Sequence, residues 1–176
     1  ETGLGHSVEE FTPEYGEDYH QDFRAVWTSN LLKDELPEGA AAHLGPLAAD
    51  FLATASARPQ EETEAAVDRL TAWVRHVRGQ LAAYDVVLTP VLAFAPPEIG
   101  HFTALEPEEN YAEQCRFTPY TSMVNVLGLP AASVPVLRSE EGLSWSVQVI
   151  GRPGAETQLL TLAAQLELSL IHISEP

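Results

Sequence analysis

Cysteine and basic residues are scarce in this 176-residue sequence, and each scarcity excludes a class of protein. The single cysteine, Cys115, excludes an internal disulfide and favours a reducing compartment such as the cytoplasm. Nine Lys and Arg residues stand against 26 Asp and Glu, which gives a formal net charge of −17. Because affinity for phosphate backbones and anionic lipids comes from Lys and Arg, we expect neither a nucleic-acid nor a membrane partner.

Long apolar runs and targeting signals are missing as well. No run approaches the roughly 20 apolar residues that cross a bilayer, and no basic-then-apolar signal peptide opens the chain. A hydrophobic fraction of 45% is ordinary for a globular protein and too high for a disordered one. The chain begins at Glu1 rather than at a Met, so we expect its natural N-terminus to lie further upstream.

Hydrophobic periodicity and chain-breaking residues predict helices that alternate with strands, which is typical of an α/β domain. The predicted helices cover residues 18–33, 44–57, 61–81, 118–127 and 157–167. The predicted strands cover residues 8–11, 86–89, 132–137 and 143–150. The run at 86–89 is apolar without alternation, which indicates a strand buried on both faces. Residues 96–111 are expected to form a long irregular segment, of a kind that often binds ligands or moves.

Three positions predict where elements start and stop. Thr118 followed by Pro119 suits the cap and first residue of a helix. Gly128 should close that helix, and Gly5 should close a helix that ends just before it, each in the left-handed conformation.

The residues alone point to no metal, no cofactor and no self-evident catalytic group. No two of the six histidines lie three or four positions apart, and neither an H-E-x-x-H, a G-x-S-x-G nor a phosphate-binding glycine loop occurs. Cys115 leaves two interpretations open: a nucleophile with a distant histidine, or a small buried hydrophobe. We favour the second, because nothing in its neighbours or spacing marks the thiol as activated.

Three stretches of sequence match, in order and spacing, the motifs of one enzyme family. They are YDVVLTP at 84–90; FTPY at 117–120 with Asn125 and GLPAASVP at 128–135; and GL at 142–143 with VQVIGRPG at 147–154 and LAAQLE at 162–167. A fourth, weaker match is LGH at 4–6 with VEE at 8–10. Together they resemble the C-terminal half of the amidase signature family, over residues 1–167.

The resemblance implies a fold, a reaction and a missing part. The fold would be α/β, a mixed β-sheet flanked by helices. The reaction would be hydrolysis of a carboxylic amide by a Ser nucleophile, with a bridging Ser in a cis peptide, a Lys as base and no cofactor. Nothing here matches the family's N-terminal catalytic segment, and the only lysine, Lys33, lies in an ordinary amphipathic helix.

We therefore expect this chain alone to be inactive. Its partners would be a small-molecule amide and the N-terminal half of the same protein, and a homodimer stays open. The resemblance also implies that this half supplies one wall of the acyl-binding pocket. The candidate substrate-binding residues are Phe117, Thr118 and Asn125, with Thr89 and Pro90 at a strand end. Each has a structural alternative: Thr118 could only cap a helix, and Asn125 could only satisfy buried backbone groups.

Two differences from the family's motifs narrow the class of substrate that we expect. Family members that serve transfer-RNA amidotransferases carry an Asp two residues before the "FT" motif, where this chain has Cys115. They also carry Arg-Tyr-Asp-Gly after "SNL", where this chain continues with LKDE at 32–35. Both differences favour a stand-alone amidase for a less polar amide.

The end of the chain also departs from the family. Residues 168–176, LSLIHISEP, resemble translated sequencing-adapter sequence, and we expect a tail that is not native. The alternative is a genuine terminal strand. A rival to the enzyme hypothesis as a whole is a free-standing, non-catalytic binding or structural domain that keeps the family's pocket wall.

Overall fold

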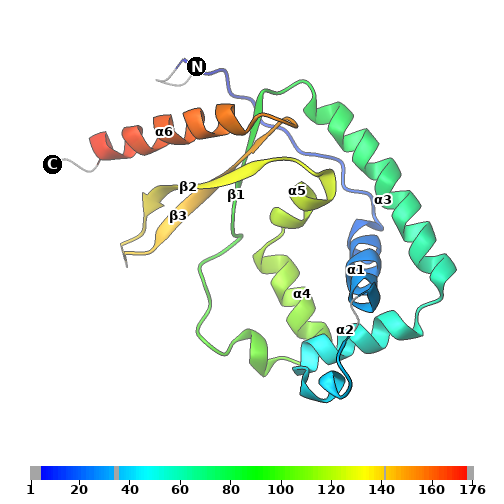
Figure 1. Cartoon of the computed structure of the whole chain (residues 1–176). Coiled ribbons are helices and arrows are strands. Elements are labelled where there is room, and N and C mark those ends of the chain that lie inside the picture. The colour runs from blue at the N-terminus through cyan, green and yellow to red at the C-terminus, as the bar shows by residue number, and fades with distance from the viewer. Residues whose placement is uncertain (1–4, 34–35, 141, 174–176) are drawn as a thin grey trace.

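The computed structural model describes residues 5–33, 36–140 and 142–173, with side chains as far as residue 168. The helices are α1 (Tyr19–Ser29), α2 (Pro46–Ala57), α3 (Gln60–Leu81), α4 (Pro107–Phe117), α5 (Thr121–Leu127) and α6 (Glu156–Ile173), with short 3-10 turns at Asn30–Lys33, Ala40–His43 and Phe102–Ala104. The strands are β1 (Val86–Pro90), β2 (Ala131–Arg138) and β3 (Ser144–Gly151). Figure 1 shows α6 beside the strands and the other helices arranged around the opposite side.

The strands form one sheet in the order β1-β3-β2. Its register places Thr89 of β1 and Ser133 of β2 on either side of Gln148 in β3. The predicted α/β fold is confirmed. Both strand pairs are antiparallel, so the mixed pairing that we predicted does not occur among the strands the structure describes.

Alternation along β3 gives the sheet two apolar layers. Val149 packs with Val134 of β2 and Leu159 of α6 in one buried cluster. Ile150, the next residue, points to the opposite face and packs with Val77 and Leu127. Since successive strand residues face opposite sides, one strand can anchor α6 on one face and α3 with α5 on the other.

Aromatic rings and ion pairs hold the helices that lie away from the sheet. Tyr19 of α1 stacks near Trp73 of α3, with ring centroids 4.6 Å apart. On the next turns of α1, Asp22 is buried and accepts hydrogen bonds from Arg69 of α3. Arg24 is bound to Glu108 of α4, with an N···O distance of 2.7 Å. These contacts lock α1 between α3 and α4.

Most predicted boundaries are confirmed to within a few residues, including the glycine that ends α5. Gly128 closes α5 at φ +59°, and Gly5 has φ +80°. The helix predicted before Gly5 falls on residues 1–4, outside the described residues. The strand predicted at residues 8–11 is wrong, because this segment runs as irregular chain. Phe11 instead packs its ring 5.1 Å from that of Tyr84.

The prediction that residues 86–89 are buried on both faces is wrong for this chain. Leu88 is 49% exposed. The reason is topological: β1 lies at the edge of the sheet, and α6 packs mainly over β2 and β3.

The predicted irregular segment at residues 96–111 is shorter than expected, because α4 begins at Pro107. The signal for α4 was a proline in the first turn followed by Glu108 and Glu109, which favour a helix N-terminus. The helix predicted from Thr118 therefore starts too early. Thr118 ends α4, where its hydroxyl donates to the carbonyl of Gln114 at 3.1 Å, and α5 begins at Thr121.

The last helix continues past the predicted end at residue 167. α6 runs to Ile173, so residues 168–173 are helical and not the terminal strand that was the alternative; residues 174–176 lie outside the described part. Within the described chain, no helix combines the length and apolar character that a membrane crossing requires.

Candidate functional site

A buried glutamine joins the end of β1 to the corner between α4 and α5. Gln148 of β3 is 7% exposed. Its Nε2 donates to Oγ1 of Thr89 at 3.0 Å and to the carbonyl oxygen of Tyr120 at 3.2 Å. Oγ1 of Thr89 in turn donates to the carbonyl oxygen of Pro90 at 2.9 Å. We call Thr89, Pro90, Tyr120 and Gln148 the Gln148 junction.

The junction follows from the pattern of β3. Ser144, Ser146 and Gln148 alternate with Trp145, Val147 and Val149, so the polar side chains share one face of the strand. The register sets Ser133 beside Gln148 on that same face. The face is therefore apolar around Ile150, where α3 and α5 cover it, and polar toward Ser146.

Three phenylalanines form an aromatic cluster at the end of α4. Phe117 lies 5.1 Å from Phe94 and 5.6 Å from Phe102, measured between ring centroids. The backbone N–H of Ala93 donates to the carbonyl oxygen of Phe117 at 3.0 Å. Buried Asn110 donates to the carbonyl oxygen of Phe102 at 2.6 Å, which fixes the segment that carries this ring. We call these three rings the Phe117 cluster.

The structure gathers four of the five predicted binding residues near one corner. Thr89 and Pro90 belong to the Gln148 junction, and Phe117 and Thr118 directly precede the turn that carries Tyr120. Asn125 stands apart, exposed on α5, where its carbonyl oxygen accepts from Gly128 at 3.1 Å. The structural alternative for Thr118 was that it only caps a helix. Its hydroxyl does cap a helix, but at the end of α4 and not at the start of α5.

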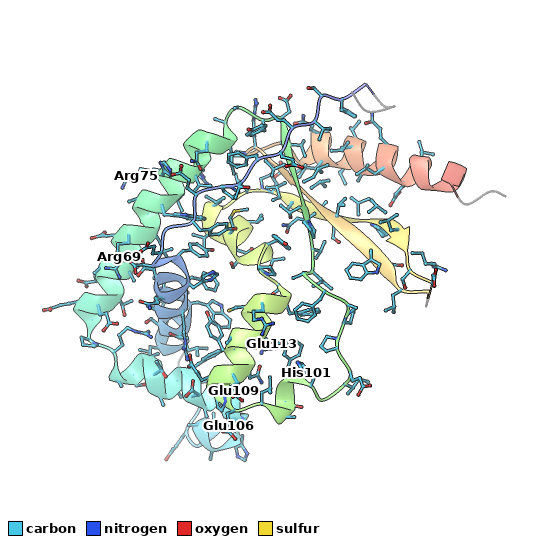
Figure 2. The ribbon with its side chains drawn as sticks, turned by 180° about the vertical axis from the view of Figure 1, so that it is seen from behind. Arg69, Arg75, His101, Glu106, Glu109 and Glu113 are labelled. Carbon is cyan, nitrogen blue, oxygen red and sulfur yellow. The ribbon has the colours of Figure 1, made fainter. Side chains whose placement is uncertain are left out.

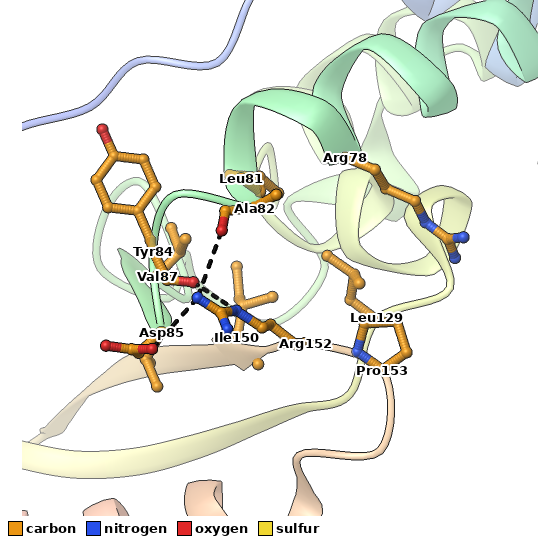
Figure 3. A pocket seen from close by; sticks show the side chains of 12 residues that line it. Arg78, Leu81, Ala82, Tyr84, Asp85, Val87, Leu129, Ile150, Arg152 and Pro153 are labelled. Carbon is orange, nitrogen blue, oxygen red and sulfur yellow. Dashed lines mark hydrogen bonds and ion pairs between the residues drawn. The ribbon is translucent and has the colours of Figure 1, made fainter.

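One cavity lies at the start of β1, and a second lies just beyond the end of this strand. The larger, about 260 Å³, is lined by apolar side chains that include Leu81, Val87 and Leu129. Its polar groups serve the fold: Nε of Arg152 donates to the carbonyl oxygen of Tyr84 at 2.9 Å, and Nη2 lies 3.2 Å from Asp85 (Figure 3). This cavity has no predicted binding residue in its lining.

The smaller cavity, about 140 Å³, borders the polar end of the sheet. It is lined by Val91, Leu92, Pro96 and Trp145, and by the hydroxyl-bearing Ser133, Ser144 and Ser146. Since Ser133 pairs with Gln148 and Val91 follows Pro90, the cavity adjoins the Gln148 junction. Apolar walls with a few hydroxyl groups suit a small neutral ligand with one polar end.

The thiol of Cys115 does not have the environment of a nucleophile. Burial of this half-buried side chain raises the pKa of the thiol, and this outweighs the opposing effects of Tyr111 and Arg24. A raised pKa lowers the fraction of reactive thiolate. The favoured interpretation was a small buried hydrophobe; the side chain is only half-buried, within α4.

Several charged residues form ion pairs between neighbouring segments. The guanidinium of Arg24 holds the pKa of Glu108 below its ordinary value by hydrogen bonding to the carboxylate. His101 lies 3.6 Å from Glu113 of α4 (Figure 2). In the portion of the chain that the structure describes, no three His, Cys, Asp or Glu side chains are grouped in a way that could hold a metal ion.

Lys33 has no catalytic arrangement around it. Its exposed Nζ donates to Oδ1 of Asn30 at 2.7 Å. The nearest serine in sequence, Ser29, donates its hydroxyl to the carbonyl of Ala25. Among the described residues, no serine hydroxyl is hydrogen-bonded to this lysine.

Sequence reasoning missed Gln148, Phe94 and Phe102. The sequence did place Gln148 on the polar face of its strand, which was the one signal for it. Its acceptors lie 59 and 28 residues away in the chain, at Thr89 and Tyr120, and only the folded chain brings them together.

The chain thus folds as an α/β domain with an uncharged, partly aromatic corner at the Gln148 junction and the Phe117 cluster. A model of the family described as Amidase matches residues 3–160. The chain belongs to this family, which the sequence motifs had indicated.

Curated relatives and solved structures agree with this assignment. A putative amidase of Synechocystis is 36% identical over 96 residues, which cover 54% of this chain and 19% of the relative. The putative amidase AmiC of Mycobacterium tuberculosis is 30% identical over 134 residues, or 76% of this chain and 26% of that protein. The structure of 6-aminohexanoate cyclic dimer hydrolase with substrate superposes with a TM-score of 0.78 at 25% identity, covering 95% of this chain and 38% of that one.

The chain thus spans roughly a fifth to two fifths of the length of these relatives.

Proposed function

We propose that this chain is the C-terminal part of an amidase, and that it forms one wall of the site that binds a carboxylic amide. The observation that carries the proposal is the family match over residues 3–160, a range that includes all five implied binding residues. We assign residues 1–167 to this part and residues 168–176 to an added tail. The single cysteine supports a cytoplasmic setting.

The catalytic groups would come from a segment that this chain does not contain. The resemblance implies a Ser hydroxyl that attacks the amide carbonyl, a second Ser that relays the proton and a neutral Lys that accepts it. The exposed, hydrogen-bonded Lys33 does not supply that base, because a catalytic Lys needs burial to lower its pKa. The isolated chain should therefore have no turnover.

The wall would select the acyl part of the substrate. Phe117, Phe94 and Phe102 offer an apolar surface, and the nearby polar groups of Thr89 and Gln148 are uncharged. The hydroxyl of Thr89 already donates to Pro90 and accepts from Gln148, so its bonds hold the shape of the wall. An amide with a neutral, apolar acyl chain fits this lining better than a charged one.

The test is amide hydrolysis by this chain joined to its upstream coding sequence. Release of ammonia from neutral amides such as hexanamide should occur with the joined protein and not with the isolated chain. Replacing Phe117 by Leu should raise KM by about tenfold, the loss expected when an apolar contact is trimmed.

The matched control is Phe23→Leu, which alters a half-buried ring on α1 stacked on Tyr19 and Trp27, away from the wall. KM should then stay unchanged. Turnover by the isolated chain, or none by the joined protein with any amide, would contradict the proposal.

A further inference from the structure

The segment that joins β1 to α4, residues 91–106, supplies side chains to both apolar surfaces near the Gln148 junction. Its two phenylalanines, Phe94 and Phe102, contribute their rings to the Phe117 cluster. Three more of its side chains line the smaller cavity, namely Val91, Leu92 and Pro96. We call residues 91–106 the joining segment. Its position therefore sets the shape of the cluster and of the cavity together.

The joining segment has little secondary structure of its own. From Phe94 to Gly100, a stretch that the structure describes in full, the chain forms neither helix nor strand. Pro96 and Pro97 have no N–H to donate, and Ile99 is fully exposed. Contacts to neighbouring elements therefore have to hold this segment in place.

Two contacts join the segment to α4. The backbone N–H of Ala93 donates to the carbonyl oxygen of Phe117 at 3.0 Å. Nε2 of His101 lies 3.6 Å from Oε1 of Glu113 (Figure 2). Both side chains of this second pair are partly exposed, and ion pairs that water reaches contribute little to stability. The pair alone does not fix the part of the segment that carries Phe102.

A third contact comes from Asn110, which is the only buried residue of α4, a helix that the structure describes throughout. Its Nδ2 donates to the carbonyl oxygen of Phe102 at 2.6 Å, and its Oδ1 accepts from Nε2 of Gln114 on the next turn. Both ends of the amide are bonded, which fixes its orientation. Surface helices usually bury apolar side chains. α4 instead buries an amide that holds the backbone of the joining segment.

We propose that Asn110 is a positioning residue for the acyl part of the substrate, because it holds the backbone of Phe102 and so keeps this ring beside Phe117. The inference rests on the proposed function. An acyl chain long enough to reach the Phe117 cluster would meet an ordered apolar surface. An amide with a very short acyl chain would not reach it. Asn110 therefore sets a preference for longer neutral acyl chains without touching the substrate.

Chain-length preference in the joined protein tests this role. Asn110→Leu removes the donor to Phe102 and keeps a side chain of similar size. The ratio of kcat/KM for hexanamide to kcat/KM for acetamide should fall about tenfold, mainly through a higher KM for hexanamide. A purely structural role would lower the amount of active protein. It would then reduce both values equally and leave their ratio unchanged.

Gln114→Leu is the milder variant, because it removes only the bond that orients Asn110. The ratio should fall in the same direction, by about threefold, and this variant decides the question if Asn110→Leu fails to fold. The matched control is Asn30→Leu, which removes an exposed amide that accepts from Lys33. It should leave the ratio unchanged. An unchanged ratio in the α4 variants, or an equal fall in Asn30→Leu, would overturn the inference.

Hydrogen–deuterium exchange measures directly whether Asn110 holds the segment. The backbone N–H groups of Ala104 and Leu105 donate to the carbonyl oxygens of Gly100 and Phe102. In the joined protein these two amides should exchange at least about tenfold faster after Asn110→Leu, since release of the segment opens these bonds. The amides of β2 serve as the internal control and should change little. Equal exchange with and without the substitution would overturn the inference.

These results separate the inference from the proposed function. Hydrolysis of both amides with an unchanged ratio would overturn the positioning role and keep the enzyme. Absence of hydrolysis by the unsubstituted joined protein with any amide would overturn the proposed function and the substrate preference that rests on it. Exchange at Ala104 and Leu105 would still decide whether Asn110 holds the joining segment.

Discussion

At the scale of single residues, Gln148 shows how one buried amide holds two distant segments in place. Replacement of Gln148 by Leu removes the buried amide that donates to Tyr120 and Thr89. We expect a loss of about 1–3 kcal/mol in the free energy of unfolding, measured with urea. Gln158→Leu, at an exposed position of α6, should change it by less than about 0.5 kcal/mol. Equal losses of unfolding free energy in the two variants would show that Gln148 does not hold these segments together.

The pair of Asp22 and Arg69 should respond asymmetrically to substitution. Asp22 is buried, whereas the side chain of Arg69 is half exposed. Arg69→Met leaves a buried carboxylate without its counter-ion, but Asp22→Asn leaves a guanidinium that water can reach. Arg69→Met should therefore lower the thermal midpoint by several degrees and by more than Asp22→Asn does.

Arg75 provides the control for this pair, because it lies on the same helix, α3, and is exposed (Figure 2). Arg75→Met should shift the midpoint by about a degree or less. If Asp22→Asn lowered the thermal midpoint by more than Arg69→Met, the prediction would be wrong. The unpaired guanidinium would then cost more stability than the unpaired buried carboxylate.

At the scale of elements, two glycines near each other in the fold should respond in opposite directions to alanine. Gly128 has φ +59°, and a Cβ there would lie 3.2 Å from Nη2 of Arg78. Gly128→Ala should cost about 1–2 kcal/mol, because the left-handed conformation is strained for an L-residue. Gly79 lies inside α3, and a Cβ at this position would have open space within 4 Å, so Gly79→Ala should add about 0.5–1 kcal/mol. Urea unfolding of both variants checks the signs.

The bounds of helices and strands were predicted correctly where a local sequence pattern sets them. They were predicted wrongly where packing between distant segments sets them. α3 carries acids in its first turn and a regular apolar stripe, so the sequence determined its extent. Thr118 has the residue type of an N-terminal helix cap, and the sequence pattern therefore placed it at the start of a helix. Only the backbone shows that it closes α4, since the carbonyl of Gln114 lies one turn before it.

At the scale of the whole molecule, the net charge of −17 should make stability depend on salt. Like charges repel in the compact state, and the screening length falls from about 30 Å at 0.01 M to about 8 Å at 0.15 M ionic strength. The thermal midpoint should therefore rise between these two NaCl concentrations.

The same rise should follow in KCl at equal ionic strength, because screening does not distinguish the two cations. A midpoint that falls with salt would mean that attractive pairs such as Arg24 and Glu108 outweigh the general repulsion.

The sequence by itself determined most helices and strands and the family, because each depends on residue types at short spacings. The tertiary structure decided which strands lie at the edges of the sheet, which groups Gln148 contacts, and that Leu88 of β1 is exposed. These features depend on pairing between residues that lie up to 59 positions apart, such as Thr89 and Gln148. Short-range patterns cannot encode such pairing, because it exists only once the chain has folded back on itself.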